Sequence, residues 1–361
     1  MELTAEQRAL RDAVRGLLAK HQEPGDHGYD PVRWQRLCGE IGVAGLAIPE
    51  CYGGAGAGPV ETHVVAEELG RDLTATPLLG SAVLAGQLLL ASGDEAACQR
   101  LLPGIADGSV LAAVAWAGPA GHWDPAAPAC TASEAGGTWR LRGQAQYVLD
   151  GDSAGVLLVA ARIPDGTAVF EVDPGQDGVL VTPAVSVDLS RRLAGVELKE
   201  AAGQRIGSSD ARPALAAARD LACIALSAEQ AGAAQQALRR TVEYTLTRVQ
   251  FGRVIGSFQA LQHRMADLYV LVESARSLSY AAAAAAAEGA ADLGLRAAAA
   301  HAYCSEALAR MAAEMIQLHG AIGVTWEHDA HRYLKRAHGA AQLFGRPTEH
   351  VARIAAALLD G

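Results

Sequence analysis

Three stretches with different hydrophobic patterns follow one another along the chain. From Leu3 to about Gly108 the apolar residues recur every three or four positions, which predicts a helical domain. Two clusters rich in Gly and Pro, Glu23 to Asp26 and Gly53 to Pro59, interrupt this pattern. Between about Val110 and Ile206, short β-branched runs are separated by Gly, Asp and Pro, and this pattern predicts a small antiparallel β domain.

Helical periodicity returns in the last part of the chain. A helix is predicted to begin at Pro213 and to run to about Thr247, followed by helices from Phe258 to Ala287 and from Leu293 to Leu318. Long Ala-rich helices of this kind bury faces against one another in a bundle. We therefore predict an α+β protein with an N-terminal α-helical domain (1–110), a central antiparallel β domain (111–211) and a C-terminal four-helix bundle (212–361).

Charge and composition exclude several classes of binding partner for this protein. With 30 basic and 40 acidic residues the formal charge is −10, which argues against nucleic acid and against an anionic membrane surface. The six cysteines include no Cys-x-x-Cys pair, so no metal site and no disulfide framework are predicted. No charge-free apolar run is long enough to span a bilayer, and a cytoplasmic location is expected.

Two C-terminal segments carry recognisable motifs. TRVQFGRVIGSFQALQHRMADLY (Thr247 to Tyr269) resembles the acyl-CoA dehydrogenase signature R-x-x-F-G, six residues, Q-x-x-Q, and MIQLHGAIGVTWEHDAHRYLKRA (Met315 to Ala337) resembles the second C-terminal signature of that family. GVAGLAIPECYGGAG (Gly42 to Gly56) and LRGQAQYVLDG (Leu141 to Gly151) are similar to further family segments. The helix, β, helix order agrees with the family fold.

The resemblance implies an FAD enzyme that removes hydrogen across the α,β bond of an acyl-CoA substrate. In the family a carboxylate takes the α proton while the β hydrogen leaves as hydride to the flavin. Family members are usually tetramers, and their electrons are expected to pass to an electron-transfer flavoprotein.

Several residues in the two signatures suit an FAD contact. The planar donor fork of a guanidinium matches a pyrophosphate better than an ammonium does. An aromatic ring can pack on the adenine or ribose, amide side chains can bond ribose or phosphate oxygens, and small residues let a turn approach the cofactor closely. The predicted FAD-binding residues are Arg248, Phe251, Gln259, Gln317, Gly320 and Ala321. In the family such positions reach the ADP half of an FAD held mainly by a neighbouring subunit.

The family's catalytic carboxylate is missing from both of its usual positions. Counting without gaps from Gln317 brings one position to Phe344, and counting back from Phe251 brings the other to Ala222. Neither phenylalanine nor alanine can accept a proton. The catalytic base of this chain is therefore unknown.

The predicted flavin side of the β domain is altered as well. Many relatives carry a Thr-Glu-Pro-x-x-Gly-Ser stretch that bonds the isoalloxazine ring, whereas this chain has VAWAGPAGHWDPAA with Trp116 near the expected threonine. Tyr147 takes the place of an aromatic near the flavin, and Leu149 replaces a second threonine. The apolar part of the predicted flavin pocket is partly kept, whereas its hydrogen-bonding side chains are missing.

The simplest interpretation is a subunit that completes the FAD site of a catalytic acyl-CoA dehydrogenase partner subunit. It resembles the base-lacking subunits of actinobacterial α2β2 enzymes, some of which act on steroid side-chain CoA thioesters. A homo-oligomeric enzyme with a relocated base is the alternative, with Glu229 as a weak candidate and Glu327 or Asp329 as others. A flavin-free scaffold or acyl-CoA-binding protein is the third. Ser190, Arg191 and Arg192 could meet CoA phosphates or form a solvated turn.

Overall fold

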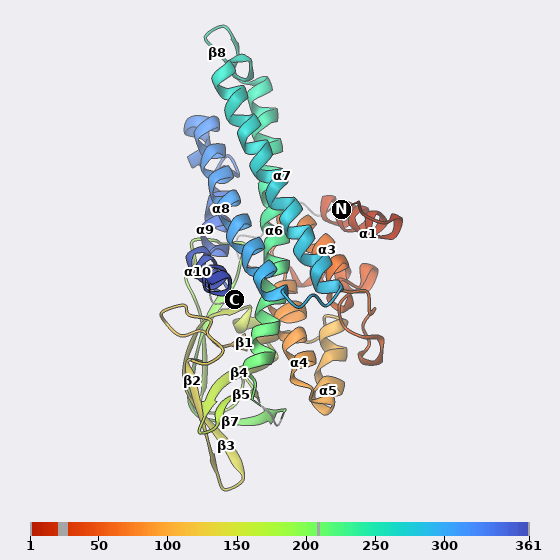
Figure 1. Cartoon of the computed structure of the whole chain (residues 1–361), viewed down its shortest axis with the longest axis vertical. Coiled ribbons are helices and arrows are strands. Elements are labelled where there is room, and N and C mark those ends of the chain that lie inside the picture. Colours follow the sequence, from red (N-terminus) through yellow and green to blue (C-terminus); the bar gives the residue numbers. More distant parts are fainter. Residues whose placement is uncertain (1, 21–27, 208–209, 360–361) are drawn as a thin grey trace.

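A β unit lies beside the N-terminal helices, and the C-terminal helices extend away from it as a long bundle (Figure 1). The computed structural model describes residues 2–20, 28–207 and 210–359. The β unit lies at one end of the molecule, the N-terminal helices lie beside its centre, and the C-terminal helices project to the far end, where the hairpin containing β8 forms the tip (Figure 1).

The N-terminal helices pack around a buried apolar core. Val14, Trp34, Leu37 and Leu69 are each at most 2% exposed within it. The Thr4 hydroxyl and the Gln7 side chain form a reciprocal capping box at the start of the first helix. The cluster Glu23 to Asp26 lies outside the described residues. The helices are α1 (Ala5–Ala19), α2 (Pro31–Arg36), α3 (Pro59–Arg71), α4 (Gly86–Ser92) and α5 (Glu95–Ala106), with the π-helices η1 (Leu37–Ile41) and η4 (Leu78–Ala85) and the 3-10 turns η2 (Val43–Gly45) and η3 (Glu50–Tyr52).

The β unit closes on itself. The order is β1-β4-β2-β3-β7-β5, β4 also pairs with β5, and β6 pairs with β7. Closure leaves few unpaired strand edges and encloses a core that includes Leu141, Leu157 and Phe170, each fully buried. The strands are β1 (Ala112–Ala115), β2 (Cys130–Ala135), β3 (Thr138–Leu149), β4 (Val156–Ile163), β5 (Gly166–Val172), β6 (Val179–Pro183) and β7 (Leu193–Ile206), with the turn η5 (Gly151–Ser153) after β3.

The C-terminal bundle is organised around one long helix. Its 36 residues, Arg212–Thr247, form α6, which at 1.5 Å per residue is roughly 54 Å long. Gly70 and Gly232 allow α3 and α6 to touch backbone to backbone, because a Cβ at either position would lie about 2 Å from the other helix. The remaining elements are β8 (Val249–Gln250), β9 (Arg253–Val254), η6 (Ile255–Ser257), α7 (Gln259–Ala287), α8 (Leu293–His319), η7 (Gly320–Val324), α9 (Ala330–Ala340) and α10 (Pro347–Leu359).

The three-part α+β architecture predicted from the hydrophobic pattern is confirmed. The sheet differs in one respect, because β1 and β2 each pair with β4 in parallel, whereas the remaining pairings of this sheet are antiparallel. Residues 116–155 connect β1 to β4 and residues 136–155 connect β2 to β4, and connections of this length allow the crossover that a parallel pair requires. In the described part of the chain, no helix combines the length and apolarity needed to cross a membrane.

Candidate functional site

The first signature segment forms the tip of the bundle. Arg248 caps the C-terminal end of α6 and is exposed, and within the described residues its guanidinium has no carboxylate partner. Phe251 lies in the turn between β8 and β9 at a φ of 54° and is 91% exposed, with its ring edge-on to Phe258 at 6.2 Å. Gln259 is exposed at the first position of α7. A positive charge, an aromatic face and an amide are therefore all open to a ligand.

The second signature segment lies at the same end of the bundle. Gln317 is exposed in the last turn of α8, and Gly320 follows this helix with a φ of 66°, where no atom stands within 4 Å of a Cβ position. Ala321 is exposed beside it. The Tyr244 hydroxyl, one helical turn before Arg248, donates to the His319 carbonyl at 3.3 Å. The fold thus ties the two signature segments together.

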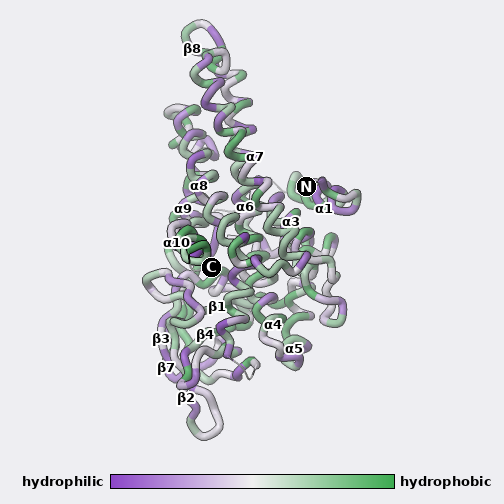
Figure 2. Tube along the Cα trace, viewed as in Figure 1, coloured by the Kyte–Doolittle hydropathy of each residue, from purple (hydrophilic) through white to green (hydrophobic). Residues whose placement is uncertain are grey.

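The tip is distant from both family base positions. Ala222 and Thr247 lie on the same straight helix, 25 residues apart, which corresponds to roughly 38 Å. Figure 2 shows hydrophilic and hydrophobic residues mixed at the tip, and Figure 1 shows the β unit at the opposite end. A ligand gripped at the tip cannot have its reacting group at Phe344 of the same chain unless it spans that length.

An aromatic cluster occupies one base position. Phe344 is 1% exposed, and its ring meets Trp123 edge-on at 5.1 Å, which in turn meets Trp116 edge-on at 5.8 Å. Trp116 and Trp123 are 1% and 4% exposed, and the Trp116 indole N–H donates to the Asp124 carbonyl at 3.1 Å. The place expected for a carboxylate is filled by packed rings, which an isoalloxazine ring could enter only by displacing them.

The second base position, Ala222, lies close to the first, Phe344. Ala222 is fully buried, and the sulfur of its neighbour Cys223 lies 4.0 Å from His350 Nε2. The same nitrogen donates to the Phe344 carbonyl at 3.1 Å. Burial lowers the pKa of His350 and raises that of the Cys223 thiol, so both side chains are neutral at physiological pH. Neither family position therefore supplies a charged base.

The carboxylate closest in sequence to Ala222 is already paired. Both oxygens of Asp220 accept hydrogen bonds from Arg353, at 2.7 and 2.8 Å, and Arg219 lies 3.3 Å from one of them. A bidentate guanidinium pair stabilises the ionised carboxylate and occupies its lone pairs. Asp220 is thus a structural link between α6 and α10.

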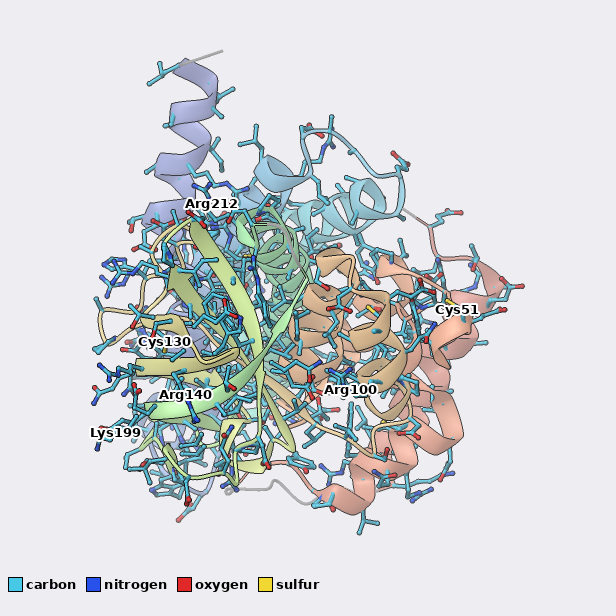
Figure 3. All side chains as sticks on the ribbon, turned by 90° about the horizontal axis from the view of Figure 1, so that it is seen from below. Cys51, Arg100, Cys130, Arg140, Lys199 and Arg212 are labelled. Carbon is cyan, nitrogen blue, oxygen red and sulfur yellow. The ribbon has the colours of Figure 1, made fainter. Side chains whose placement is uncertain are left out.

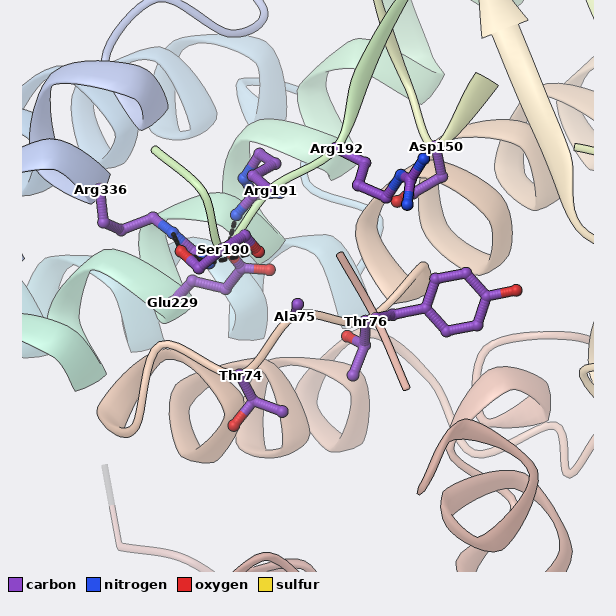
Figure 4. A pocket seen from close by; sticks show the side chains of 10 residues that line it. Thr74, Ala75, Thr76, Asp150, Ser190, Arg191, Arg192, Glu229 and Arg336 are labelled. Carbon is purple, nitrogen blue, oxygen red and sulfur yellow. Dashed lines mark hydrogen bonds and ion pairs between the residues drawn. The ribbon is translucent and has the colours of Figure 1, made fainter. Parts of the chain in front are cut away.

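Glu229, the weak candidate for a relocated base, lies in a buried ion network. It pairs with Arg191 and with Arg336, whose Nη1 is 3.4 Å from Glu229 Oε2 (Figure 4). Arg336 Nε also lies 2.8 Å from Asp188 Oδ2. Glu229 is therefore the shared anion of two guanidinium groups rather than a free carboxylate. The prediction of CoA contacts or a solvated turn at Arg191 differs from this structure, because its side chain is only 9% exposed and is paired inward.

A small cavity borders this network. Its volume is about 10 Å³, roughly enough for one water molecule, and it is lined by Thr74, Thr76, Asp150, Glu229 and the three arginines 191, 192 and 336 among others. Burial raises the pKa of Asp150 to about 7, against the opposing effect of Arg191. The cavity is too small for an acyl chain.

The other two candidate carboxylates lie at the far end of α9. Asp329 accepts from Arg240 at 2.7 Å and is 3.6 Å from Arg332, and Glu327 is exposed. The 11 residues of α9, roughly 16 Å, separate them from the turn that carries Phe344. Neither is placed to act there.

At the predicted flavin positions of the β domain, the chain keeps the aromatic side chain but lacks the hydrogen-bonding threonine side chains. Tyr147 has a φ of 58°, is 36% exposed and donates from its hydroxyl to the Pro119 carbonyl at 3.4 Å. Leu149 is 2% exposed and packs against Gly80, whose Cβ position would lie 2.9 Å from the Leu149 Cβ. At these two positions the Tyr147 hydroxyl is bonded within the chain, and Leu149 has no hydrogen-bonding side chain.

Sequence reasoning missed the residues that hold these regions together. Tyr244 and His328 flank His319 at the tip, and Trp123 joins Phe344 to Trp116. Tyr244 had a detectable signal, since it precedes Arg248 by one helical turn and so faces the same end of the bundle. The Trp123 contact is tertiary and leaves no local pattern.

Comparisons with known proteins place this arrangement in a family. Sequence-family models match residues 4–109, described as "Acyl-CoA dehydrogenase, N-terminal domain", and residues 216–359, described as "Acyl-CoA dehydrogenase, C-terminal domain". The acyl-CoA dehydrogenase IpdE2 of Mycolicibacterium smegmatis is 37% identical over 98% of this chain and 99% of its own length.

Solved structures agree with these matches. A chain of the ChsE4-ChsE5 complex from Mycobacterium tuberculosis superposes with a TM-score of 0.90 at 31% identity, covering 100% of this chain and 99% of that one. A variant of the Tcur3481-Tcur3483 steroid ACAD superposes with a TM-score of 0.89 at 32% identity, covering 99% and 98%. This chain belongs to the acyl-CoA dehydrogenase family.

Proposed function

We propose that this chain is the non-catalytic subunit of a heteromeric flavin-dependent acyl-CoA dehydrogenase. In this assembly its bundle tip grips the ADP half of an FAD whose flavin ring lies on a catalytic partner subunit. Bound flavin supplies the hydride acceptor, and the partner supplies the base and the acyl-CoA site. This chain contributes binding and orientation of the cofactor.

One observation carries the proposal. The groups suited to a pyrophosphate and an adenine are exposed at the tip, whereas both base positions and the threonine position near the flavin are buried and filled with apolar side chains. Because the two regions lie roughly 38 Å apart along α6, the tip serves a cofactor centred on another chain.

The relatives support a heteromer. ChsE4-ChsE5 is named as a complex, and the Tcur3481-Tcur3483 protein is named as a steroid ACAD. We infer a comparable pair here, a bulky steroid-derived acyl-CoA as substrate of the pair, and an electron-transfer flavoprotein as electron acceptor. The ion pairs of Glu229 argue against a homo-oligomer that uses this residue as base. A flavin-free scaffold would not need Arg248, Phe251 and Gln259 exposed together.

Co-expression tests the proposal. The chain would be produced alone and together with the dehydrogenase encoded beside it, and flavin absorbance and oligomeric mass would be measured. We expect the lone chain to purify without flavin and the pair to purify as a yellow, active heteromer. A yellow, active homotetramer of the lone chain would reject the proposal.

A further inference from the structure

Three aromatic rings form a stack beneath the turn of the second signature. The His319 ring lies parallel to Tyr244 of α6, with centroids 4.3 Å apart and planes 26° apart, and His328 lies 4.3 Å from His319. His319 is the last residue of α8 and only 4% exposed. The turn Gly320–Val324 runs from His319 toward His328, so the stack closes the base of this turn.

Hydrogen bonds fix the proton on each imidazole. His319 Nδ1 lies 2.7 Å from the Met315 carbonyl, which can only accept, so this nitrogen carries the proton. His319 Nε2 is buried and has no hydrogen-bond partner among the described residues. His328 Nδ1 accepts from the Ala330 backbone N–H at 3.1 Å, so its proton is on Nε2. Both rings are thus neutral in this arrangement.

The stack also joins the two predicted FAD-binding segments. Tyr244 stands one turn before Arg248, its ring contacts His319, and its hydroxyl donates to the carbonyl of the same residue at 3.3 Å. Gly320 follows directly, with a backbone conformation that leaves its surroundings open. If the His319 ring is removed, the Gly320 turn and the Arg248 end of α6 lose the ring stack and keep the Tyr244 hydrogen bond to the backbone carbonyl.

We propose that His319 is a positioning residue for FAD, which holds the Gly320 turn at a fixed place relative to Arg248. This inference rests on the proposed function. It makes cofactor affinity depend on a neutral imidazole, because protonation would place a charged N–H at the buried Nε2 of His319, which has no hydrogen-bond partner among the described residues.

The charged and titratable groups around the stack determine the direction of the pH effect. Arg240 of α6 acts on His328 and is itself paired with Asp329 at 2.7 Å and, more loosely, with Asp72 at 3.9 Å. Burial lowers the pKa of His319, and the neighbouring His328 lowers it further. The pKa of His328 is lowered mainly by burial. Protonation therefore begins below the ordinary histidine value of about 6.5, and cofactor affinity is expected to fall there.

The test uses the complex with the catalytic partner and measures FAD release by flavin fluorescence at pH 8 and pH 5.5. His319→Ala removes two ring contacts, so we expect roughly tenfold weaker FAD binding at pH 8. His319→Phe keeps the stack without a titrating group, so it should bind FAD within about threefold of wild type at pH 8 and resist the acid loss. His338→Phe, an exposed histidine of α9, is the matched control and should keep the wild-type acid loss.

Two outcomes separate this inference from the proposed function. Wild-type FAD affinity in His319→Ala, or unchanged acid release in His319→Phe, would overturn the role of His319 if Arg248→Ala still releases FAD. Retention of FAD by Arg248→Ala would instead overturn the proposed function.

Hydrogen exchange of residues 320–324 in the chain purified alone gives a readout without the partner. Exchange there should quicken in His319→Ala but not in His319→Phe, and equal rates in both would contradict the stack's role in holding the turn.

Discussion

The bundle tip and the region around Phe344 correspond to the two halves of the proposed FAD site, and they differ in how their side chains are packed. At the tip, Arg248 and Phe251 are exposed and contribute little to internal packing. Around Phe344, three aromatic rings are packed with at most 4% exposure. The filled region contributes to stability, whereas the exposed tip contributes little to it and, in the proposed function, binds a cofactor held by another chain. Side chains outside both regions, such as Arg140 and Lys199 on the outer face of the β unit, provide neutral comparisons (Figure 3).

The largest effect is expected from restoring a carboxylate at the base position. Phe344→Glu removes a buried ring and buries a carboxyl, so we expect a loss of about 4 kcal/mol in the free energy of unfolding, measured by urea denaturation. Phe344→Leu, the control, should lose about 1.5 kcal/mol. Wild-type stability together with dehydrogenase activity in the lone Phe344→Glu chain would show that this region is an open site.

The free energy of unfolding should depend on pH through the buried carboxyl of Asp150. Burial raises the pKa of Asp150 to about 7 from an ordinary 3.8, so the folded state keeps a proton that the unfolded state releases. Stability should therefore fall as the pH rises from about 4 to 7, by at most about 4 kcal/mol. Asp150→Asn keeps the left-handed backbone, where Asn is tolerated, and should remove this decrease. An identical pH profile for wild type and variant would show that Asp150 is solvated.

Breaking the ion network should cost somewhat less. Glu229→Gln leaves Arg191 and Arg336 without their shared anion, and we expect a loss of about 3 kcal/mol in unfolding free energy. In the assembled enzyme kcat should change by less than about threefold, since structural pairs do not act on the transition state. A thousandfold fall in kcat with unchanged stability would identify Glu229 as the base.

The smallest effect is expected at the exposed tip aromatic. Phe251→Ala should change stability by no more than about 0.5 kcal/mol because its side chain is 91% exposed. In the complex it should weaken FAD binding about tenfold, as measured by equilibrium dialysis, through loss of stacking on the adenine. Equal FAD affinity in wild type and variant would remove Phe251 from the binding surface.

Much of the fold follows from local pattern. Helix α6 was predicted from Pro213 to Thr247 and spans Arg212–Thr247, and α8 was predicted to end within one residue of its observed end at His319. The helical periodicity of these Ala-rich segments, together with the Gly and Pro residues at their ends, is a strong local signal. By contrast, β1 is four small buried residues with no alternation, so its parallel pairing with β4 has no sequence signature.

The candidate site also has parts that the sequence predicts and parts that depend on tertiary packing. Motif spacing identified Arg248, Gln259 and Gln317, and the structure brings their segments to one end of the bundle. The absence of a carboxylate at Phe344 was readable, but the packing of Trp123 against it was not, because these residues lie far apart in the chain. Whether a lost group leaves a hole or a filled core depends on tertiary contacts.

The most direct test of the account is Arg248→Ala in this chain alone, with the catalytic partner subunit left unchanged. A charge-assisted hydrogen bond to phosphate is worth about 2 kcal/mol, so we expect roughly thirtyfold weaker FAD binding in the purified complex. Arg140→Ala, an exposed arginine on β3, should have no effect. Full FAD affinity after Arg248→Ala would contradict the claim that this tip grips a cofactor centred on another chain.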